Sequence, residues 1–183
     1  MKNWQINRAR RVLEQGGVIA YPTEAVMGLG CNPWNETAVA KVLRLKRRPA
    51  AKGLIIAASS IEQLSAVVDF SKVTKQEEII RSWPGPVTWL IPVRAVTPPW
   101  LSGQHETLAV RVSAHPVVRR LCDELGLLVS TSANPSGCRP ARTQRRARAY
   151  FGVAVDCYVP GKVGGDPRPS TIRDAFSGRL VRE

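Results

Sequence analysis

Short apolar runs typical of strands alternate along this chain with amphipathic segments typical of helices, and this alternation restricts the fold more than any other feature. The runs lie at residues 18–21, 53–58, 87–93, 107–112, 127–129 and 153–159, with shorter ones at 170–173 and 180–182. Because strands and helices interleave irregularly, the sequence predicts an α/β fold with a twisted mixed sheet and flanking helices. We expect one domain over residues 1–183, since no repeat, low-complexity tract or linker interrupts the chain.

Capping residues indicate where several of the helices begin. Asn35 and Thr143 each precede a helical pattern, and a side-chain oxygen at such a position can accept a hydrogen bond from the first turn. Ser59 and Thr74 are each followed three residues later by glutamate, which is the pattern of a capping box. We therefore expect helices to begin at these four positions.

The strongest compositional signal is charge. The chain has 27 Lys and Arg residues against 14 Asp and Glu residues, which gives a formal net charge of +13. A positive field of this size attracts polyanions such as nucleic acids or nucleotides, although it does not distinguish between them. A basic surface without a dedicated partner is the less favoured interpretation.

Other sequence features argue against membranes, secretion and a structural metal. No apolar run approaches the roughly 20 residues that a membrane span needs, and the N-terminus lacks the apolar segment of a signal peptide. We therefore expect a cytoplasmic location. The four cysteines and two histidines are too widely spaced to suggest a zinc site, so we predict no protein-bound metal and read the cysteines as buried or incidental thiols.

Polar side chains gather where the apolar runs end. Thr23 and Glu24 follow the first run, where they either cap a hairpin corner or project into a crevice. Lys46, Arg48 and Lys52 lie where a helix gives way to a strand. Three cations on such a turn suit a polyphosphate as well as they suit a solvated helix end, so both interpretations remain open.

A second cluster follows the run at 127–129. Residues 130–134 read STSAN, and such hydroxyl and amide groups either bind phosphate or carboxylate oxygens or satisfy their own loop. Their density favours binding. Arg111 lies within a strand between Val110 and Val112, so its side chain points to the face opposite theirs, either toward solvent or toward a carboxylate.

Familiar catalytic signatures are missing from the chain. It contains no P-loop, no complete dinucleotide fingerprint and no hydrolase nucleophile elbow. The chemistry must therefore rest on the clusters just described.

Six segments resemble, in order and spacing, the YrdC-like threonylcarbamoyl-AMP synthases, and the resemblance covers nearly the whole chain. These segments are YPTEAVMGLG, LKRRPAAKGL, WPGPVTWLIP, TLAVRVSAHP, STSANPSG and PSTIRD. The resemblance implies a single α/β domain with a large basic cavity. It also implies a reaction in which L-threonine, bicarbonate and ATP give threonylcarbamoyl-AMP and pyrophosphate. The product would supply the threonylcarbamoyl group for the adenosine beside the anticodon of ANN-decoding tRNAs, added by a separate transferase complex.

The same resemblance implies roles for individual residues. Its catalytic set contains Lys46, Arg48, Ser132 and Asn134. These four residues would also bind the nucleotide, together with Lys52, Thr107 and Ser136. Threonine would be held by Thr23, Arg111, Thr131 and Ser170, with Arg111 pairing the substrate carboxylate. Mg²⁺ is expected on the polyphosphate, without a protein cage of its own.

Four departures from the family pattern stand out. Ala25 and Met27 replace a hydroxyl residue and an aromatic residue that many relatives carry, and both are compatible with a place in the cavity wall. Ser113 stands where relatives often have proline. Lys52-Gly53 replaces a common Asn-Pro or Lys-Pro pair, which weakens the assignment of Lys52.

An alternative function, from another class, is a basic RNA-binding or RNP-assembly module. It rests on the net charge and on five arginines within residues 139–148. The absence of an aromatic RNA-recognition motif such as RNP1 weakens this alternative.

Overall fold

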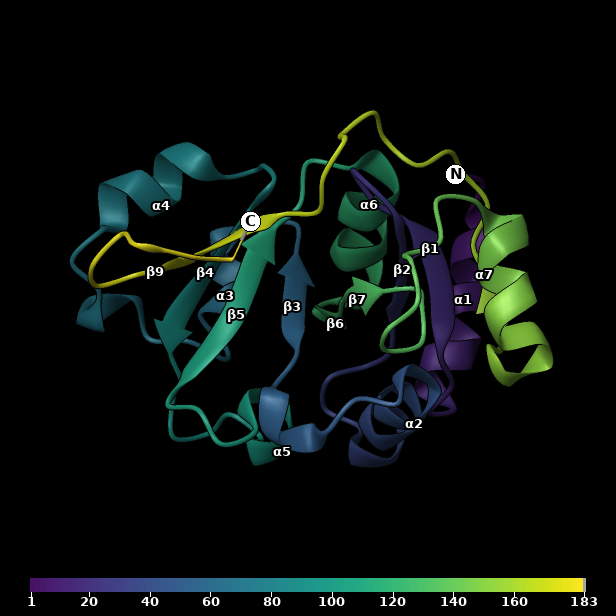
Figure 1. Ribbon diagram of the computed structural model, residues 1–183, viewed down its shortest axis with the longest axis horizontal. Coiled ribbons are helices and arrows are strands. Elements are labelled where there is room, and N and C mark those ends of the chain that lie inside the picture. Colours follow the sequence, from purple (N-terminus) through teal and green to yellow (C-terminus); the bar gives the residue numbers. More distant parts are fainter. Residues whose placement is uncertain (183) are drawn as a thin grey trace.

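The computed structural model describes residues 1–182, whose strands form two sheets (Figure 1). The larger sheet has the order β10-β9-β4-β5-β3-β6 and the smaller one β7-β2-β1-β8. Both sheets mix parallel and antiparallel neighbours, which confirms the predicted mixed α/β fold. The single predicted sheet is wrong, because the strands divide into two hydrogen-bonded sets.

The strands are β1 (Ile19–Pro22), β2 (Met27–Gly30), β3 (Ile55–Ala58), β4 (Val87–Pro92), β5 (Thr107–Val112), β6 (Leu128–Val129), β7 (Thr131–Ser132), β8 (Cys157–Tyr158), β9 (Thr171–Asp174) and β10 (Leu180–Arg182). The helices are α1 (Asn3–Glu14), α2 (Glu36–Lys46), α3 (Ile61–Leu64), α4 (Gln76–Ser82), α5 (Pro99–Ser102), α6 (Pro116–Leu125) and α7 (Gln144–Phe151), with short 3-10 turns at Ala50–Lys52, Phe70–Lys72 and Gly152–Ala154.

The two sheets meet where the chain passes from β6 to β7. Ser130 separates these strands, and its amide donates to the carbonyl oxygen of Ile55 in the larger sheet at 2.7 Å. One residue earlier, the amide of Val129 donates to the carbonyl of Cys31, just beyond β2 of the smaller sheet, at 3.0 Å. Gly30 allows this approach, because a Cβ atom there would lie 2.0 Å from the carbonyl oxygen of Val129. The polar residues of β7 therefore emerge at the junction of the sheets.

The apolar core fixes this junction from two sides. On one side α1 and α6 pack against β1 through a cluster that includes Ile6, Leu13 and Leu121. The other, larger cluster extends from α2 across both sheets and includes Val110 and Val112 of β5. Since these two valines are buried in the core, Arg111 between them points to the opposite face, as the alternation predicts.

The predicted helix starts are partly confirmed. The side chains of Asn35 and Thr143 accept hydrogen bonds from the amides of Ala38 and Arg146, as N-caps do. The other two predictions are wrong by one residue. The side chain that caps α3 belongs to Ser60, and the Thr74 hydroxyl donates instead to the carbonyl of Phe176, which fixes it outside α4.

The strand predicted at 153–159 is shorter than expected. Only Cys157–Tyr158 pairs with β1, while Gly152–Ala154 forms a 3-10 turn. The side chain of Val153 is fully exposed, at 99%, so it gains nothing from pairing against the sheet. Within residues 1–182, no helix has the length and apolar character that crossing a membrane requires.

Candidate active site

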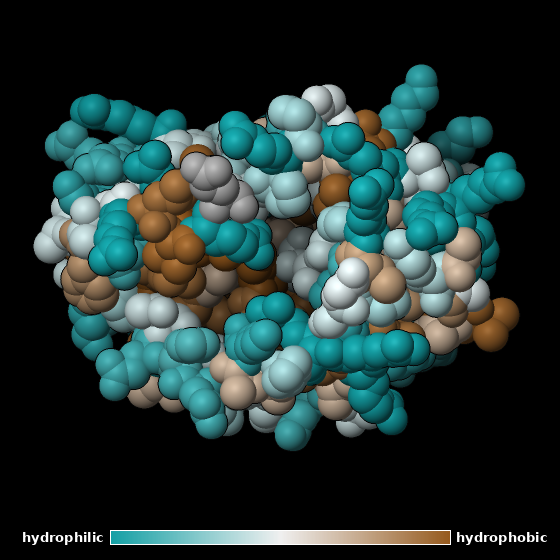
Figure 2. Space-filling view, in the orientation of Figure 1, coloured by the Kyte–Doolittle hydropathy of each residue, from teal (hydrophilic) through white to brown (hydrophobic). Residues whose placement is uncertain are grey.

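A cavity of about 380 Å³ opens between the two sheets, and a size of this order suits a small-molecule site. Figure 2 shows a hollow on this face, with hydrophobic side chains along one wall and hydrophilic side chains around its rim. Nine of the eleven residues predicted for the site line the cavity. They are Thr23, Lys46, Arg48, Arg111, Thr131, Ser132, Asn134, Ser136 and Ser170.

The hairpin between β1 and β2 forms one wall. Thr23 begins its turn, where both the amide and the hydroxyl of Thr23 donate to the carbonyl of Val26, at 3.0 and 2.7 Å. Thr23 is therefore a hairpin-corner residue and a cavity-lining residue at once, so the two interpretations of this segment are both correct.

Lys46 ends α2 with its side chain buried. Its ammonium donates to the carbonyl oxygens of Ser132 and Asn134, the latter at 3.0 Å, and lies 3.4 Å from the Ser132 hydroxyl. Burial, and then the positive charge of Arg48, lowers the pKa of Lys46 to about 8. An anion in the cavity would reverse part of this effect, because it stabilises the charged ammonium.

Arg48 is held by main-chain carbonyls just after α2. Its Nε donates to Gly53 at 3.1 Å and its Nη2 donates to Lys52 at 3.0 Å. Burial lowers the pKa of Arg48, although a guanidinium remains charged at neutral pH. Lys52 thus contributes to the site through its carbonyl group, while its own side chain is exposed.

The STSAN segment lies against Lys46 and forms the same wall of the cavity. Thr131 and Ser132 pair with β2, and Asn134 follows in a tight loop. The Asn134 amide group donates to the carbonyls of Pro135 and Cys138, at 3.0 and 2.7 Å, while its Oδ1 atom is buried without a hydrogen-bond partner. A buried acceptor of this kind costs free energy until a donor reaches it. The side chain of Asn134 is thus held by two main-chain carbonyls beside the cavity.

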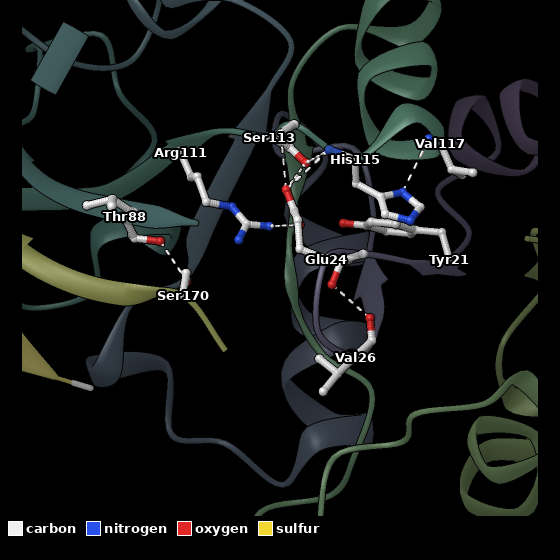
Figure 3. Close-up of polar contacts among 12 residues, drawn as sticks. Tyr21, Glu24, Val26, Thr88, Arg111, Ser113, His115, Val117 and Ser170 are labelled. Atoms are coloured by element: carbon white, nitrogen blue, oxygen red, sulfur yellow. Dashed lines mark hydrogen bonds and ion pairs between the residues drawn. The ribbon is translucent and has the colours of Figure 1, made fainter. Parts of the chain in front are cut away.

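Arg111 and Ser170 lie on the far side of the cavity. The Ser170 hydroxyl is 2.9 Å from that of Thr88, and the Arg111 Nη2 is 2.9 Å from a carboxylate oxygen of Glu24 (Figure 3). Burial alone would raise the pKa of Glu24, but Arg111 and the Ser113 hydroxyl hold the pKa of this carboxyl below its ordinary value. Glu24 and Arg111 thus form a nearly buried ion pair at the edge of the cavity.

The remaining two predicted residues, Lys52 and Thr107, lie outside this cavity. They line an adjoining hollow of about 240 Å³. The two hollows share four lining residues, Arg48, Ile55, Thr131 and Arg182, so they adjoin. A ligand longer than the first cavity can therefore extend past Arg48 toward Lys52 and Thr107.

Four charged residues line the cavity that sequence reasoning did not select for the site: Glu24, Asp166, Arg168 and Arg182. Glu24 follows Thr23 directly in the chain, so the selection of Thr23 for the site already pointed to this position. Arg182 belongs to the last strand, where nothing local marks it, and burial together with the charge of Arg48 lowers its pKa. The cavity thus has five cationic side chains, at positions 46, 48, 111, 168 and 182, against two carboxylates. Its charge favours an anionic ligand.

Ala25 and Met27, the two departures within the segment YPTEAVMGLG, lie in different surroundings. Ala25 is buried and lines the cavity. Met27 is buried in the larger apolar cluster and lines neither of the two hollows. Its side chain points to the core because β2 alternates between the core and the cavity.

The cysteines agree with their interpretation as thiols without a shared function. Cys31, Cys122 and Cys157 are buried, and Cys138 is exposed; none of the four forms a disulfide. Over residues 1–182, no group of three or more His, Cys, Asp or Glu side chains is arranged to hold a metal ion.

Comparison with known proteins identifies the family to which this chain belongs. Residues 11–183 match the Sua5/YciO/YrdC family, which carries the description telomere recombination. A relative from Marinobacter nauticus, named threonylcarbamoyl-AMP synthase, is 51% identical over 180 residues, covering 97% of this chain and 95% of that protein.

Solved structures show the same fold. P. abyssi Sua5 complexed with L-threonine is 32% identical, with a TM-score of 0.88, over 95% of this chain. This chain spans about half of that protein, 52% of its length. E. coli YciO, at 24% identity, shares the fold with a TM-score of 0.87, and the match covers 100% of this chain and 90% of YciO. With the sequence match and the shared fold together, the chain belongs to the Sua5/YciO/YrdC family.

Proposed function

We propose that this protein, as a single domain over residues 1–183, is a threonylcarbamoyl-AMP synthase. L-threonine and bicarbonate give a carbamate with loss of water, and a carbamate oxygen attacks the α-phosphorus of ATP so that pyrophosphate leaves. The observation that carries the proposal is the cavity between the two sheets, where cations and hydroxyl groups from distant segments converge. The relative that bears this name is 51% identical over nearly the whole chain.

The amino-acid end of the substrate would lie against Arg111. Its guanidinium can hold a carboxylate through two parallel hydrogen bonds, and the hydroxyl groups of Thr23, Thr131 and Ser170 line the same cavity. The P. abyssi protein is described as complexed with L-threonine, which supports threonine as the amino acid here.

The phosphate end would lie against Lys46 and Arg48. Both side chains are positioned by main-chain carbonyls, so little reorganisation is needed when a phosphate arrives. Arg182 lines the same part of the cavity and would add a third cation. Ser132 and Asn134, which lie against Lys46, would contact the phosphates as well, while Ser136, Lys52 and Thr107 would contact the rest of the nucleotide. Catalysis would then consist of positioning the reactants and neutralising charge on the phosphates.

ATP would enter as its magnesium complex. Of the two carboxylates lining the cavity, Glu24 is occupied by Arg111, which leaves Asp166. Mg²⁺ bound mainly by phosphate oxygens and water needs at most one or two such groups. The residues present therefore suit a cation that arrives with the nucleotide.

The test is pyrophosphate release with each substrate omitted in turn. Release should require threonine, bicarbonate and ATP together, and the adenylate should appear in equal amount. Unchanged release after omission of threonine or bicarbonate would contradict the assignment, because it would indicate plain ATP hydrolysis. The product would serve, in the cytoplasm, a separate transferase complex that modifies the adenosine beside the anticodon of ANN-decoding tRNAs.

Direct RNA contact is a second candidate, and the position of the arginines on α7 favours it. Arg145 and Arg146 lie in the first turn of this helix, where the helix dipole disfavours cations. No ion pair joins an arginine of residues 139–148 to a carboxylate within residues 1–182. Arg146 and Arg148 stack on Tyr150 and Tyr158, at 4.5 and 4.1 Å from the ring centres. A stable fold does not require this arrangement, whereas a polyanion would benefit from it.

Two exposed arginines allow a matched test of this second candidate. Arg145→Glu on α7 and Arg119→Glu on α6 change the net charge equally. Only Arg145→Glu should weaken the binding of unmodified tRNA. It should also make the affinity less dependent on salt, because the logarithm of the binding constant falls against the logarithm of the salt concentration with a slope of about −0.7 for each phosphate contacted on a single strand. Equal effects of both variants would leave only non-specific attraction.

A further inference from the structure

Glu24 is tied into the cavity wall more firmly than a substrate-binding side chain needs to be. Its Oε2 atom accepts a hydrogen bond from Arg111 at 2.9 Å, and the side chains of Arg111 and Glu24 are only 9% and 12% exposed. Figure 3 shows the two side chains reaching toward each other from β5 and from the turn after β1. The proposed reaction gives this carboxylate no role in binding a substrate.

The other oxygen of Glu24 is held by the turn between β5 and α6. Oε1 accepts from the Ser113 hydroxyl at 2.6 Å, from the amide of Ala114 at 3.1 Å and from that of His115 at 3.3 Å (Figure 3). Moving this carboxylate away would leave several donors unsatisfied in a part-buried place. Glu24 is therefore a fixed acceptor and cannot swing aside when a ligand enters.

Arg111, by contrast, keeps most of its donors available. A guanidinium has five N–H groups, and within residues 1–182 Glu24 is the acceptor that hydrogen-bonds to it. Those nitrogen atoms of Arg111 that have no hydrogen bond are accessible rather than buried, and Arg111 lines the cavity. The free edge of the guanidinium therefore faces the cavity, while one Nη2 hydrogen anchors the group to Glu24.

The main chain of the turn that contains Glu24 also holds the segment around Gly164 and Asp166. The carbonyls of Thr23 and Glu24 accept from the amides of Gly164 and Asp166, at 2.9 and 3.2 Å. Those two residues belong to the segment that crosses the top of the molecule between β8 and β9 (Figure 1) and leads to Ser170. The hairpin turn thus fixes both Arg111 and the segment opposite it.

We propose that Glu24 is a positioning residue for the amino-acid substrate: it orients the free edge of Arg111 toward the cavity so that Arg111 can take the substrate carboxylate. The inference rests on the proposed function, since it concerns the amino-acid end of that site. Without Glu24 the guanidinium would still carry its charge, but it would lose the hydrogen bond that holds its Nη2 atom. Fixed geometry matters here because bidentate pairing with a carboxylate is directional.

The test replaces Glu24 by glutamine and measures L-threonine binding by calorimetry, without nucleotide. In Glu24→Gln the remaining oxygen can still accept from the β5–α6 turn, but an NH₂ group now meets the Arg111 Nη2, donor against donor. We expect the threonine Kd and the threonine KM to rise at least tenfold, with the ATP KM within twofold of wild type. Ser113→Ala is the matched control: it removes one donor of Glu24 but leaves the ion pair, so we expect a change below threefold.

Two other outcomes overturn the proposal. An unchanged threonine Kd in Glu24→Gln would make Glu24 a structural residue only, and a lower Kd would make it a competitor that occupies Arg111 in the empty site. If Glu24→Gln does not fold, Glu24→Asp decides: it keeps the charge but withdraws it by one methylene, and an unchanged or lower Kd again overturns the proposal. A wild-type protein that binds no threonine would overturn the proposed function as well, whereas the first two outcomes leave that function intact.

Discussion

The ammonium of Lys46 lies 3.0 Å from the main-chain oxygen of Asn134, and this hydrogen bond ties the end of α2 to the loop after β7. The amide of Ser136 returns the contact by donating to the carbonyl of Lys46 at 2.7 Å. Two segments that are distant in the sequence are thereby held as one wall of the cavity, with the charge of Lys46 inside it.

Removing either phosphate-side cation should slow the reaction strongly. We expect Lys46→Ala and Arg48→Ala each to lower kcat by on the order of 10²–10³, the usual effect of losing one preorganised donor to transition-state charge. Steady-state pyrophosphate release measures this. Arg44→Ala is a suitable control, since Arg44 is exposed on the same helix and lines neither hollow. Near-wild-type turnover in both test variants would refute their phosphate role.

The pKa of Lys46, lowered to about 8, predicts a pH dependence of nucleotide use. As the pH rises above about 8 in the free enzyme, Lys46 loses its proton and the attraction for phosphate weakens. We therefore expect kcat/KM for ATP to fall above this pH, because this ratio reports ionisations of the free enzyme. In Lys46→Arg the side chain stays charged, so the fall should disappear. The same profile in both proteins would assign the fall to another group.

The same shift has a consequence for stability, with the opposite sign. Between about pH 8 and the ordinary value of 10.5, the unfolded chain keeps the Lys46 proton while the folded protein has lost it. Stability rises with pH wherever the unfolded state binds more protons, so Lys46 should add to the free energy of unfolding across this window. Chemical denaturation of wild type and of Lys46→Met at several pH values checks this. A wild-type curve parallel to that of the variant would argue against the lowered pKa.

Arg142 should control the segment that crosses the cavity. Its guanidinium donates to the carbonyls of Asp166 and Pro167, both at 3.1 Å, and its Nε donates to that of Ala25 at 3.4 Å. We expect Arg142→Ala to raise the hydrogen-exchange rates of the Gly164 and Asp166 amides, because the segment then opens more readily. The exposed neighbour Arg145, replaced by alanine, should leave these rates unchanged. Equal rates in Arg142→Ala and wild type would show that backbone pairing alone holds the segment.

Gly30 should be intolerant of any side chain. A Cβ atom there would lie 2.0 Å from the carbonyl oxygen of Val129, where the two sheets meet. We expect Gly30→Ala to lower the free energy of unfolding by about 3 kcal/mol, the upper part of the usual range for overpacking. Urea denaturation measures the loss. Gly165→Ala is the control, since a Cβ atom there meets no atom within 4 Å, and a similar loss in both variants would contradict the steric argument.

The sequence alone determined the features that depend on neighbouring residues. Alternating apolar runs predicted the α/β class, and the side chains of Asn35 and Thr143 cap helices as expected. The sequence also selected polar clusters that lie together in the folded chain, although the contacts that join them, such as that of Lys46 with Asn134, are tertiary. Nine of the eleven predicted residues accordingly line one cavity.

The tertiary structure decided what depends on segments far apart in the chain. Glu24 meets Arg111 across 87 residues, and Arg182 reaches the cavity only through the pairing of β10 with β9. The junction of the two sheets depends on the close approach of Gly30 to Val129, and in the segment predicted as a strand at 153–159 the side chain of Val153 is fully exposed. Such contacts are set by register and burial across the whole fold, which local propensity and spacing do not contain.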